Sequence, residues 1–480
     1  MAEAKRPNIL FLFSDQHRYD AVSANGNPVC RTPAIDSLAR DGMSFQRAYT
    51  TIALCTPARA TVVTGLFPHN HGQLANIGNF NGVFDRQVLG KPHLNHYLKA
   101  QGYQIGMAGK WHLPEDGNCQ AWEADEWHTE REFHRQLRDR GIDFEQGRSN
   151  VQRLEWTGNA TFCGPSVLKA EDAFETWVAD HVISMMDRFA RNDAPFMIHS
   201  SFFAPHFPYA VPEPFDKMYD PSRIPMWTNF NETFENKPTV QQSEMLRWNA
   251  SHLTWPDWQR AIAAYYGYCT YMDTQIQRIL DALDARGLRE NTLVIYSADH
   301  GDMLGSHRIF NKGMNGYEET HHIPCFARWP GVIAPGSTCD AFTSLADIMP
   351  TFLDAAGCAD QPAMDGRSML PLFRGETPAD WRKDIFYEFH GYEPALCSIR
   401  VVRTDKWKYV YNPCSEDELY DIETDPGELH NLAPLRGFKH VLRRMKLRMV
   451  DWLRATNDSI VEEDSWKGCP YDLYITQREE

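Results

Sequence analysis

The sequence has no hydrophobic run long enough to cross a lipid bilayer. A membrane-spanning helix needs about 20 consecutive apolar residues, whereas the longest early run, Ile9 to Phe13, has the length of a β-strand. The start, Met1 to Arg6, is short and charged, and shows neither the apolar segment nor the cleavage site of a secretory leader. We therefore expect no membrane contact and a cytoplasmic location; a periplasmic or secreted location is the alternative if a leader precedes this sequence.

Paired cysteines and basic runs are also lacking. The 11 cysteines are scattered, with no Cys-x-x-Cys pair and no zinc-like cysteine cluster, so we expect most of them to be reduced and structural. The net charge is −16, and no run of lysine and arginine could neutralise the phosphates of a nucleic acid. This argues against nucleic acid as the partner, but a local basic pocket could still bind a small anionic substrate.

Internal repeats and low-complexity tracts are absent, which excludes a repeat array. With 480 residues, 42% of them hydrophobic and 23% charged, the chain has the composition of a globular protein. That length exceeds a single small core and indicates one large domain with a smaller one, or two to three ordinary domains.

Four short apolar runs are followed directly by polar, chemically capable residues. Two of them, Asn8 to Phe13 and Thr292 to Ser297, are continuous apolar stretches, typical of strands buried on both faces. The other two candidates are Tyr103 to Ala108 and Phe196 to Ser201. Ligands of parallel sheets gather beyond the carboxyl ends of the strands, so we expect the residues that follow to meet at one edge. These residues are Asp15 and Gln16, Asp299 and His300, Lys110 and His112, and His206.

Helical patterns alternate with these strands. They cover Pro33 to Asp41, Asn95 to Gln101, Ala170 to Arg191 and Trp258 to Gly287. This alternation predicts an α/β fold with a large, doubly wound, mostly parallel sheet flanked by helices. After about residue 375 the pattern changes to half-exposed antiparallel strands, at 399–402, 407–411 and 418–421, and a helix at 440–455. We therefore predict a catalytic α/β domain at 1–375 and a small C-terminal α+β subdomain at 376–480.

Cys55 lies in the most informative stretch, Ala53-Leu54-Cys55-Thr56-Pro57-Ala58-Arg59-Ala60-Thr61-Val62-Val63-Thr64-Gly65. Thr56 can cap a helix, Pro57 suits a first helical turn and Gly65 suits a helix end. Residue 55 would then lie beside a helix N-terminus, which favours an anion. The competing interpretation is a buried structural cysteine, the commoner role of a single Cys.

This stretch resembles the signature of the formylglycine-dependent sulfatases, members of the alkaline phosphatase superfamily. Gly102 to His112 is similar to the second signature of that family, although Ile105 replaces the usual Ser or Thr. The resemblance extends to the C-terminal region, which includes the Glu418-Leu419-Tyr420-Asp421 and Asp425-Pro426-Gly427-Glu428 patterns. It implies that a maturation enzyme oxidises Cys55 to formylglycine, whose aldehyde hydrate is the nucleophile.

A divalent metal site is indicated by Asp15, Gln16, Asp299 and His300. Three oxygen donors and one imidazole favour Ca²⁺, Mg²⁺ or Mn²⁺ over zinc, and the resemblance implies Ca²⁺ with residue 55 as a further ligand. Many sulfatases carry Asp at the position of Gln16 and Asn at that of His300. The Gln and His variants also occur among relatives that include phosphonate monoester hydrolases, which leaves the metal and the substrate open.

The resemblance further implies catalytic roles for Cys55, Arg59, Lys110, His112, His206 and Lys312. Lys110, Lys312 and His206 would spread the charge of the sulfuryl group, and Arg59 would orient the aldehyde hydrate. His112 would remove the proton of its second hydroxyl. The leaving alcohol would be protonated by His206 or Lys312, between which the sequence does not choose.

The chain is thus expected to be a sulfuric ester hydrolase that acts on the sulfate monoester of a small or carbohydrate alcohol or phenol. A phosphonate monoester or phosphodiester hydrolase with the same site is the first alternative, since phosphoryl and sulfuryl transfer share geometry and charge demands. A catalytically silent protein that binds a sulfated ligand is the second. A homo-oligomer is compatible with the sequence, as is a monomer.

Overall fold

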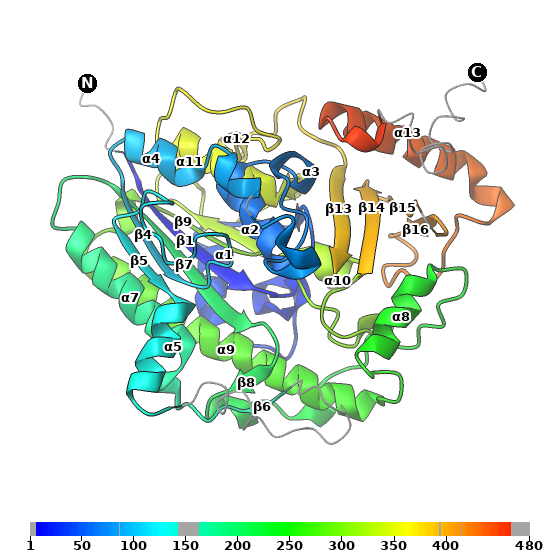
Figure 1. The fold of residues 1–480 in the computed structure, drawn as a ribbon, viewed down its shortest axis with the longest axis horizontal. Coiled ribbons are helices and arrows are strands. Elements are labelled where there is room, and N and C mark those ends of the chain that lie inside the picture. Colours follow the sequence, from blue (N-terminus) through cyan, green and yellow to red (C-terminus); the bar gives the residue numbers. More distant parts are fainter. Residues whose placement is uncertain (1–5, 86, 143–162, 393–394, 414, 462–480) are drawn as a thin grey trace.

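The structure, a computed structural model, describes residues 6–85, 87–142, 163–392, 395–413 and 415–461 (Figure 1). Its centre is an eight-stranded sheet of order β11-β2-β10-β9-β1-β7-β4-β5. The strands are β1 (Asn8–Asp15), β2 (Met43–Phe45), β4 (Gln104–Gly109), β5 (Glu126–Thr129), β7 (Phe196–Pro205), β9 (Thr292–Ala298), β10 (Cys325–Arg328) and β11 (Ser337–Cys339). All neighbouring pairs are parallel except those of β10, which runs antiparallel to β9 and β2.

Helices cover both faces of this sheet because its central strands are apolar on both sides. Leu10 and Leu12 of β1 pack with α1 (Pro33–Asp41), α7 (Phe174–Phe189) and α9 (Trp255–Ala285). Ile9, Phe11 and Phe13 point to the opposite face, where α2 (Cys55–Thr64), α4 (Leu94–Ala100) and α11 (Ile348–Ala355) lie. The predicted doubly wound, mostly parallel sheet is therefore confirmed.

Shorter elements complete the large part of the molecule. Two small parallel pairs join β3 (Ala48–Tyr49) to β12 (Thr343–Ser344) and β6 (Cys163–Pro165) to β8 (Tyr209–Val211). The remaining helices here are α3 (Pro68–His71), α5 (Glu130–Asp139), α8 (Thr239–Arg247), α10 (Glu318–His321) and α12 (Leu370–Phe373). Within the described ranges, no helix is both long enough and apolar enough to cross a membrane.

The C-terminal region forms a four-stranded antiparallel sheet of order β13-β14-β15-β16. Its strands are β13 (Ile385–Tyr392), β14 (Ala395–Arg403), β15 (Trp407–Tyr411) and β16 (Glu418–Asp421), and α13 (Lys439–Ala455) covers one face. Phe386 and Tyr409 face α13, while Tyr387 and Val401 belong to the same hydrophobic core as the large sheet. The two sheets therefore share a core, and the boundary at residue 375 stays a prediction.

The helix at Cys55 begins two residues earlier than a cap at Thr56 predicts. Cys55 is its first residue, and Leu54, with an extended backbone, is the N-cap. The prediction that Thr56 caps the helix is wrong; its hydroxyl oxygen instead accepts a hydrogen bond from the backbone N–H of Ile77. Gly65 ends the helix as expected, with the positive φ of 67° that favours glycine.

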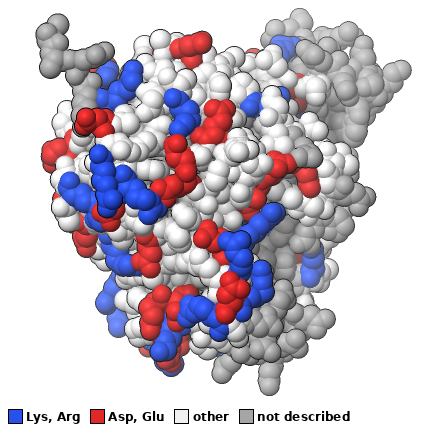
Figure 2. All heavy atoms as spheres, turned by 60° about the vertical axis from the view of Figure 1, so that its left-hand side comes forward, with Lys and Arg blue, Asp and Glu red and all other residues white. Residues whose placement is uncertain are grey.

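Charged side chains of both signs are interspersed over the face of the molecule that includes its α7 side (Figure 2). On this face there is no continuous basic stripe, in keeping with the acidic net charge of −16.

Candidate active site

Most of the candidate residues come from the carboxyl ends of four adjacent strands and from α2 (Cys55–Thr64), while Lys312 lies in the connection between β9 and α10. β1 ends at Asp15, β9 is followed by Asp299, and β4 is followed by Lys110. Because β1 pairs in parallel with both β7 and β9, these ends lie side by side. Cys55, at the N-terminus of α2, faces the same edge. The structure thus brings together all ten residues named from the sequence.

Cys55 Sγ lies at the centre of this cluster. Its nearest polar neighbours are Lys312 Nζ at 3.0 Å, His300 Nε2 at 3.3 Å and Asp15 Oδ1 at 3.7 Å. Lys110 Nζ lies 4.0 Å away. Burial raises the pKa of the Cys55 thiol, but the positive charges of Lys110, Lys312 and His300 outweigh it and hold that pKa well below its usual value. The surroundings of residue 55 therefore favour negative charge.

The donor set fits a divalent metal ion. Asp15, Cys55, Asp299 and His300 each offer one ligand atom, and these atoms all lie within 4.8 Å of one another in a fully buried cluster. His300 Nδ1 is hydrogen-bonded to the carbonyl oxygen of Gly301 at 2.8 Å, which leaves Nε2 directed at the cluster. The carboxylate oxygens suit a hard cation.

Gln16, the remaining predicted ligand, lies beside this set, directly after Asp15 at the end of β1. Its Nε2 donates to Asp302 Oδ2 at 2.5 Å and to Asn311 Oδ1 at 2.9 Å, so Oε1 is turned toward Lys312 Nζ, 3.1 Å away. Asp302 in turn accepts a hydrogen bond from Tyr209 Oη at 2.6 Å. The amide of Gln16 is thereby fixed in one orientation.

Two of the residues that hold Gln16 were missed as site residues by the sequence analysis. Asp302 lies three positions beyond Asp299, and Asn311 directly precedes Lys312. Asn311 also donates from Nδ2 to Tyr392 Oη of β13 at 2.7 Å, which links the C-terminal sheet to the cluster. Only their adjacency to recognised residues could have drawn attention to them, because a single Asp or Asn carries no signal of its own.

Arg59 has different partners from those implied by the resemblance. Its guanidinium bonds Asp15 Oδ2 at 2.8 Å and Asp299 Oδ2 at 3.0 Å. It also donates to the backbone oxygen of Lys110 and to Ser201 Oγ. Its side-chain hydrogen bonds therefore go to the two carboxylates, to Lys110 and to Ser201, so Arg59 holds these groups together, and its orientation of the aldehyde hydrate stays a prediction.

The two carboxylates are held in different electrostatic environments. Burial and the charge of Cys55 oppose ionisation of Asp15, but Lys110, His206 and Arg59 hold its pKa far below the usual value. Lys110 Nζ lies only 2.6 Å from Asp15 Oδ2. Burial and the neighbouring Asp15 raise the pKa of Asp299 to about 6. An added cation would stabilise the charged form of both carboxylates.

His112 and His206 both hydrogen-bond to the Cys55 side chain. Burial is the main reason that the pKa of each imidazole is lowered, to about 4 for His206. His206 Nε2 lies 3.3 Å from Lys312 Nζ, and its ring stacks on Phe207 with centroids 4.8 Å apart. Neutral imidazoles can accept protons, so both rings are suited to proton transfer.

An aromatic wall adjoins His206. Phe207 packs edge-on against Trp248 at 5.5 Å, and the guanidinium carbon of Arg247 lies 5.5 Å from the Trp248 ring centroid. Arg247 also lies 4.6 Å from the ring of Tyr392. These side chains come from the segment after β7, from α8 with the residue after it, and from β13.

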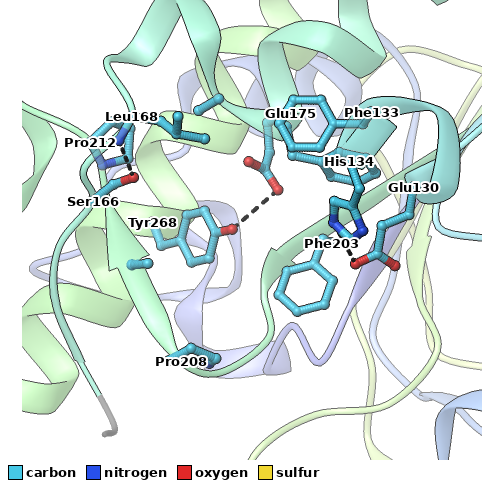
Figure 3. Close-up of a pocket in the computed structure, with 13 residues that line it drawn as sticks. Glu130, Phe133, His134, Ser166, Leu168, Glu175, Phe203, Pro208, Pro212 and Tyr268 are labelled. Carbon is cyan, nitrogen blue, oxygen red and sulfur yellow. Dashed lines mark hydrogen bonds and ion pairs between the residues drawn. The ribbon is translucent and has the colours of Figure 1, made fainter. Parts of the chain in front are cut away.

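A pocket lined by Phe203 and Pro208 adjoins the end of β7, close to the loop that carries His206 (Figure 3). The Phe203 ring lies 5.0 Å from Lys110 Nζ and also lines this pocket. Glu175 of α7 projects into the same space, where its Oε1 accepts from Ala204 N at 2.9 Å and from Tyr268 Oη at 3.3 Å. Because Ala204 lies two residues before His206, Glu175 helps to fix the end of β7.

The fold and this cluster define a hydrolase of the alkaline phosphatase superfamily, with metal-ligand candidates at the carboxyl edge of a doubly wound sheet. The chain belongs to the sulfatase family: the Sulfatase family model matches residues 7–358, and the model of the N-sulphoglucosamine sulphohydrolase C-terminal region matches residues 305–455. It is accordingly a sulfatase, an enzyme that hydrolyses sulfuric esters.

Individual relatives match over almost the full length. An N-acetylglucosamine-6-O-sulfatase of Bacteroides thetaiotaomicron is 28% identical over 90% of this chain and 83% of that protein. An arylsulfatase of Clostridium perfringens is 28% identical over 97% of this chain and 98% of its own length. The structure of a phosphonate monoester hydrolase from Silicibacter pomeroyi matches with a TM-score of 0.80 at 25% identity, covering 94% of this chain and 96% of that one.

Proposed function

We propose that this sulfatase cleaves the sulfate monoester of a carbohydrate, another small alcohol or a phenol, with a formylglycine formed from Cys55 and a divalent metal, most simply Ca²⁺. The observation that carries the proposal is the arrangement of lysines, histidines and carboxylates around Cys55 Sγ, within 4.0 Å for Lys312, His300, Asp15 and Lys110. The sugar substrate is suggested by the N-acetylglucosamine-6-O-sulfatase that this chain resembles.

Two groups would supply the reactive chemistry. Formylglycine at residue 55 would offer the two hydroxyls of its hydrate, one to attack sulfur and the other to release the aldehyde again. A cation held by Asp15, Gln16, Asp299 and His300 would favour the ionised hydroxyl near neutral pH. The formylglycine-generating enzyme is the protein partner that this proposal requires.

The chain's own side chains would bind and stabilise the sulfuryl group. Lys312 and Lys110 present ammonium groups within 4.0 Å of residue 55 and would spread the negative charge that builds up on the sulfuryl oxygens. Arg59 would keep both metal-binding carboxylates in place, because it bonds Asp15 and Asp299 together.

Proton transfer would fall to the imidazoles and Lys312. His112 would take the proton of the second hydroxyl, since its ring contacts the residue 55 side chain. His206 and Lys312, 3.3 Å apart, lie on one side of the cluster, and one of them would protonate the leaving alcohol. Their closeness makes a shared role the simplest arrangement.

The first experiment is a peptide mass spectrum of the fragment that contains residue 55, from protein made in a host with maturation activity. The mass of formylglycine is the expected result. Unmodified cysteine in every molecule, in protein that nevertheless hydrolyses an aryl sulfate, would remove formylglycine from the mechanism.

Phosphonate monoester or phosphodiester hydrolysis is the second candidate function. Gln16 and His300 favour it, because the same variants occur in phosphonate monoester hydrolases, one of which shares this fold at 25% identity. Comparing kcat/KM for an aryl sulfate and for an aryl phosphonate monoester separates the two functions. We expect faster sulfate cleavage; faster phosphonate cleavage would reverse the assignment.

A further inference from the structure

A second group of metal-ligating side chains lies outside the Cys55 cluster. It consists of His128 on β5, Glu132 on α5 and His181 on α7. These elements adjoin one another at one side of the large sheet, where β5 is the edge strand (Figure 1). The three side chains are partly buried; those of His128 and Glu132 are 21% and 25% exposed. The group is therefore fixed by three elements and still open to solvent.

The distances within this group are those of a nearly formed metal site. Each side chain offers one ligand atom, and all three atoms lie within 4.8 Å of one another. His128 Nδ1 lies 3.0 Å from Glu132 Oε2, and the two imidazole rings are stacked with centroids 3.9 Å apart. Ligands bonded to Zn²⁺ at about 2.0–2.2 Å in a tetrahedron are a little over 3 Å apart. Small side-chain rotations would bring all three into range.

The surroundings of His128 also match those of a metal ligand. Its Nε2 is buried, and the carboxylate oxygen Oε2 of Glu126 lies 3.6 Å away. The carboxylate of Glu126 is itself held by Arg188, whose Nε donates to Oε1 at 2.6 Å. Metal-bound histidines commonly direct their other ring N–H at such a carboxylate. Coordination through Nδ1 would place a proton on Nε2 and close this contact.

We propose that His128, Glu132 and His181 bind a transition-metal ion with the ligand preferences of Zn²⁺, with water completing its coordination. Two imidazoles among three ligands favour such an ion over Ca²⁺ or Mg²⁺. The simpler interpretation is an ion pair between His128 and Glu132, four residues apart, with a stacked histidine beside it. That interpretation accounts for two of the side chains, whereas a metal ion accounts for the convergence of all three ligand atoms within 4.8 Å.

The protonation state of His181 agrees with this assignment. Burial and the neighbouring His128 lower the pKa of His181 to about 4, so its imidazole is neutral at physiological pH. A neutral imidazole is the form that binds a metal ion. A bound ion would join the edge strand β5 to α5 and α7 and stabilise this side of the sheet, because it binds only the folded arrangement.

The test is zinc binding to the full-length enzyme over a series of buffered free Zn²⁺ concentrations, with bound metal determined by mass spectrometry and Tm recorded in parallel. We expect the wild type to bind one more equivalent than His181→Ala and Glu132→Gln, and its Tm to rise with zinc while theirs does not. Glu126→Gln should bind this equivalent about 10- to 100-fold more weakly. Zinc at the Cys55 cluster is common to all variants and cancels in the comparison.

His134→Ala is the matched control. His134 lies on the same helix, has the same 21% side-chain exposure as His128 and forms its own i,i+4 contact with Glu130 at 3.5 Å. It should retain the additional equivalent and the zinc-dependent Tm. Equal zinc content in all variants, or loss of the equivalent from His134→Ala as well, would overturn the proposal. Glu132→Gln keeps the test decisive if His181→Ala does not fold.

Discussion

The cluster around Cys55 contains three positively charged side chains, those of Lys110, Lys312 and Arg59, and two carboxylates. The opposite charges of these groups determine which chemistry the site favours. The ammonium groups of Lys312 and Lys110 lie within 4.0 Å of Cys55 Sγ, while Arg59 pairs with Asp15 and Asp299. Within a buried site such charges act more strongly than in water. Such positive groups stabilise an ester whose sulfuryl or phosphoryl oxygens carry one or two negative charges.

Cys55→Ala should abolish turnover while the fold is kept. The nucleophile would be lost, so we expect kcat for an aryl sulfate to fall by at least about 10⁴-fold, whereas Tm should change by only a few degrees. Steady-state kinetics and thermal unfolding measure the two effects. Cys119→Ala, a partly buried cysteine outside the site, is the control and should keep full activity. Retained turnover in Cys55→Ala would place the nucleophile elsewhere.

Asn311→Leu should lower the affinity of the enzyme for its metal ion, with a smaller effect on the free energy of unfolding. Leucine has a similar size but removes the oxygen that accepts from Gln16 Nε2 at 2.9 Å and the amide that donates to Tyr392. Gln16 would lose its fixed orientation, and we expect metal affinity about 10- to 100-fold lower. Isothermal titration of the metal-free enzyme with Ca²⁺ or Mn²⁺ measures this directly. Unchanged affinity would show that Asp302 alone orients the amide.

At the scale of single elements, the strand ends matter because they carry the reactive side chains. Gly109 ends β4 with a φ of 119°, and a Cβ there would lie 1.8 Å from the backbone oxygen of Ser201. That oxygen accepts the backbone N–H of Lys110 at 2.9 Å. The lack of a side chain at residue 109 therefore lets β4 and β7 stay close enough to direct Lys110 toward Cys55.

Gly109→Ala should consequently reduce both stability and activity. Separating the two strands would move Lys110, and we expect kcat to fall about 10- to 100-fold with a loss of stability above about 2 kcal/mol. Chemical denaturation and kinetics report these values. Gly102→Ala is the matched control: it has a positive φ of 81° but nothing within 4 Å of the added Cβ. It should cost about 1 kcal/mol and leave kcat unchanged. Equal effects would attribute the loss at Gly109 to backbone strain alone.

At the scale of the whole molecule, a buried charge cluster joins the C-terminal sheet to the large part. His69 of α3 bonds Glu388 of β13 through Nδ1 at 2.8 Å and the backbone oxygen of Thr456 through Nε2 at 3.0 Å. Arg400 of β14 pairs with Asp458 at 2.6 Å. Because both ring nitrogens of His69 face acceptors, its charged form satisfies the most partners.

This cluster predicts a stability that falls at alkaline pH. Burial opposes the charge of His69, but Glu388 and Asp458 raise its pKa to about 9, whereas the unfolded value is about 6.5. The folded state thus holds this proton more tightly, so the stabilisation is complete below about pH 6.5 and is lost as pH rises through about 9. The total is roughly 3 kcal/mol at most.

His69→Gln tests this linkage. Glutamine keeps hydrogen-bonding capacity without the proton, so the variant should be less stable than the wild type at pH 6 and should lose less stability between pH 6.5 and 9. Denaturant unfolding at several pH values measures both slopes. His96→Gln, at a histidine whose side chain is 56% exposed, is the control. Parallel slopes for the wild type and His69→Gln would assign the pH dependence to other groups.

The sequence alone was informative where apolar residues form a continuous or periodic run, or where several motif residues lie close together in the chain. The apolar runs at Asn8 and Thr292 predicted β1 and β9 within two residues of their ends, and α1 was predicted with its observed bounds. The strand β13 and the antiparallel β10 were not predicted, because short strands without clear alternation resemble any apolar loop segment. The start of α2 was misplaced by two residues, because the hydroxyl of Thr56, a residue type that often caps helices, instead accepts a hydrogen bond from the backbone N–H of Ile77.

What the sequence determined by itself was the family, the fold class and the residue types of the site, because these depend on the order of residues along the chain. The tertiary structure decided which residues contact one another: it assigned Arg59 to the two carboxylates and added Asp302, Asn311 and Tyr392 around Gln16. It also brought together His128, Glu132 and His181. Such contacts join residues up to hundreds of positions apart, and only the packing of strands and helices fixes their distances and orientations.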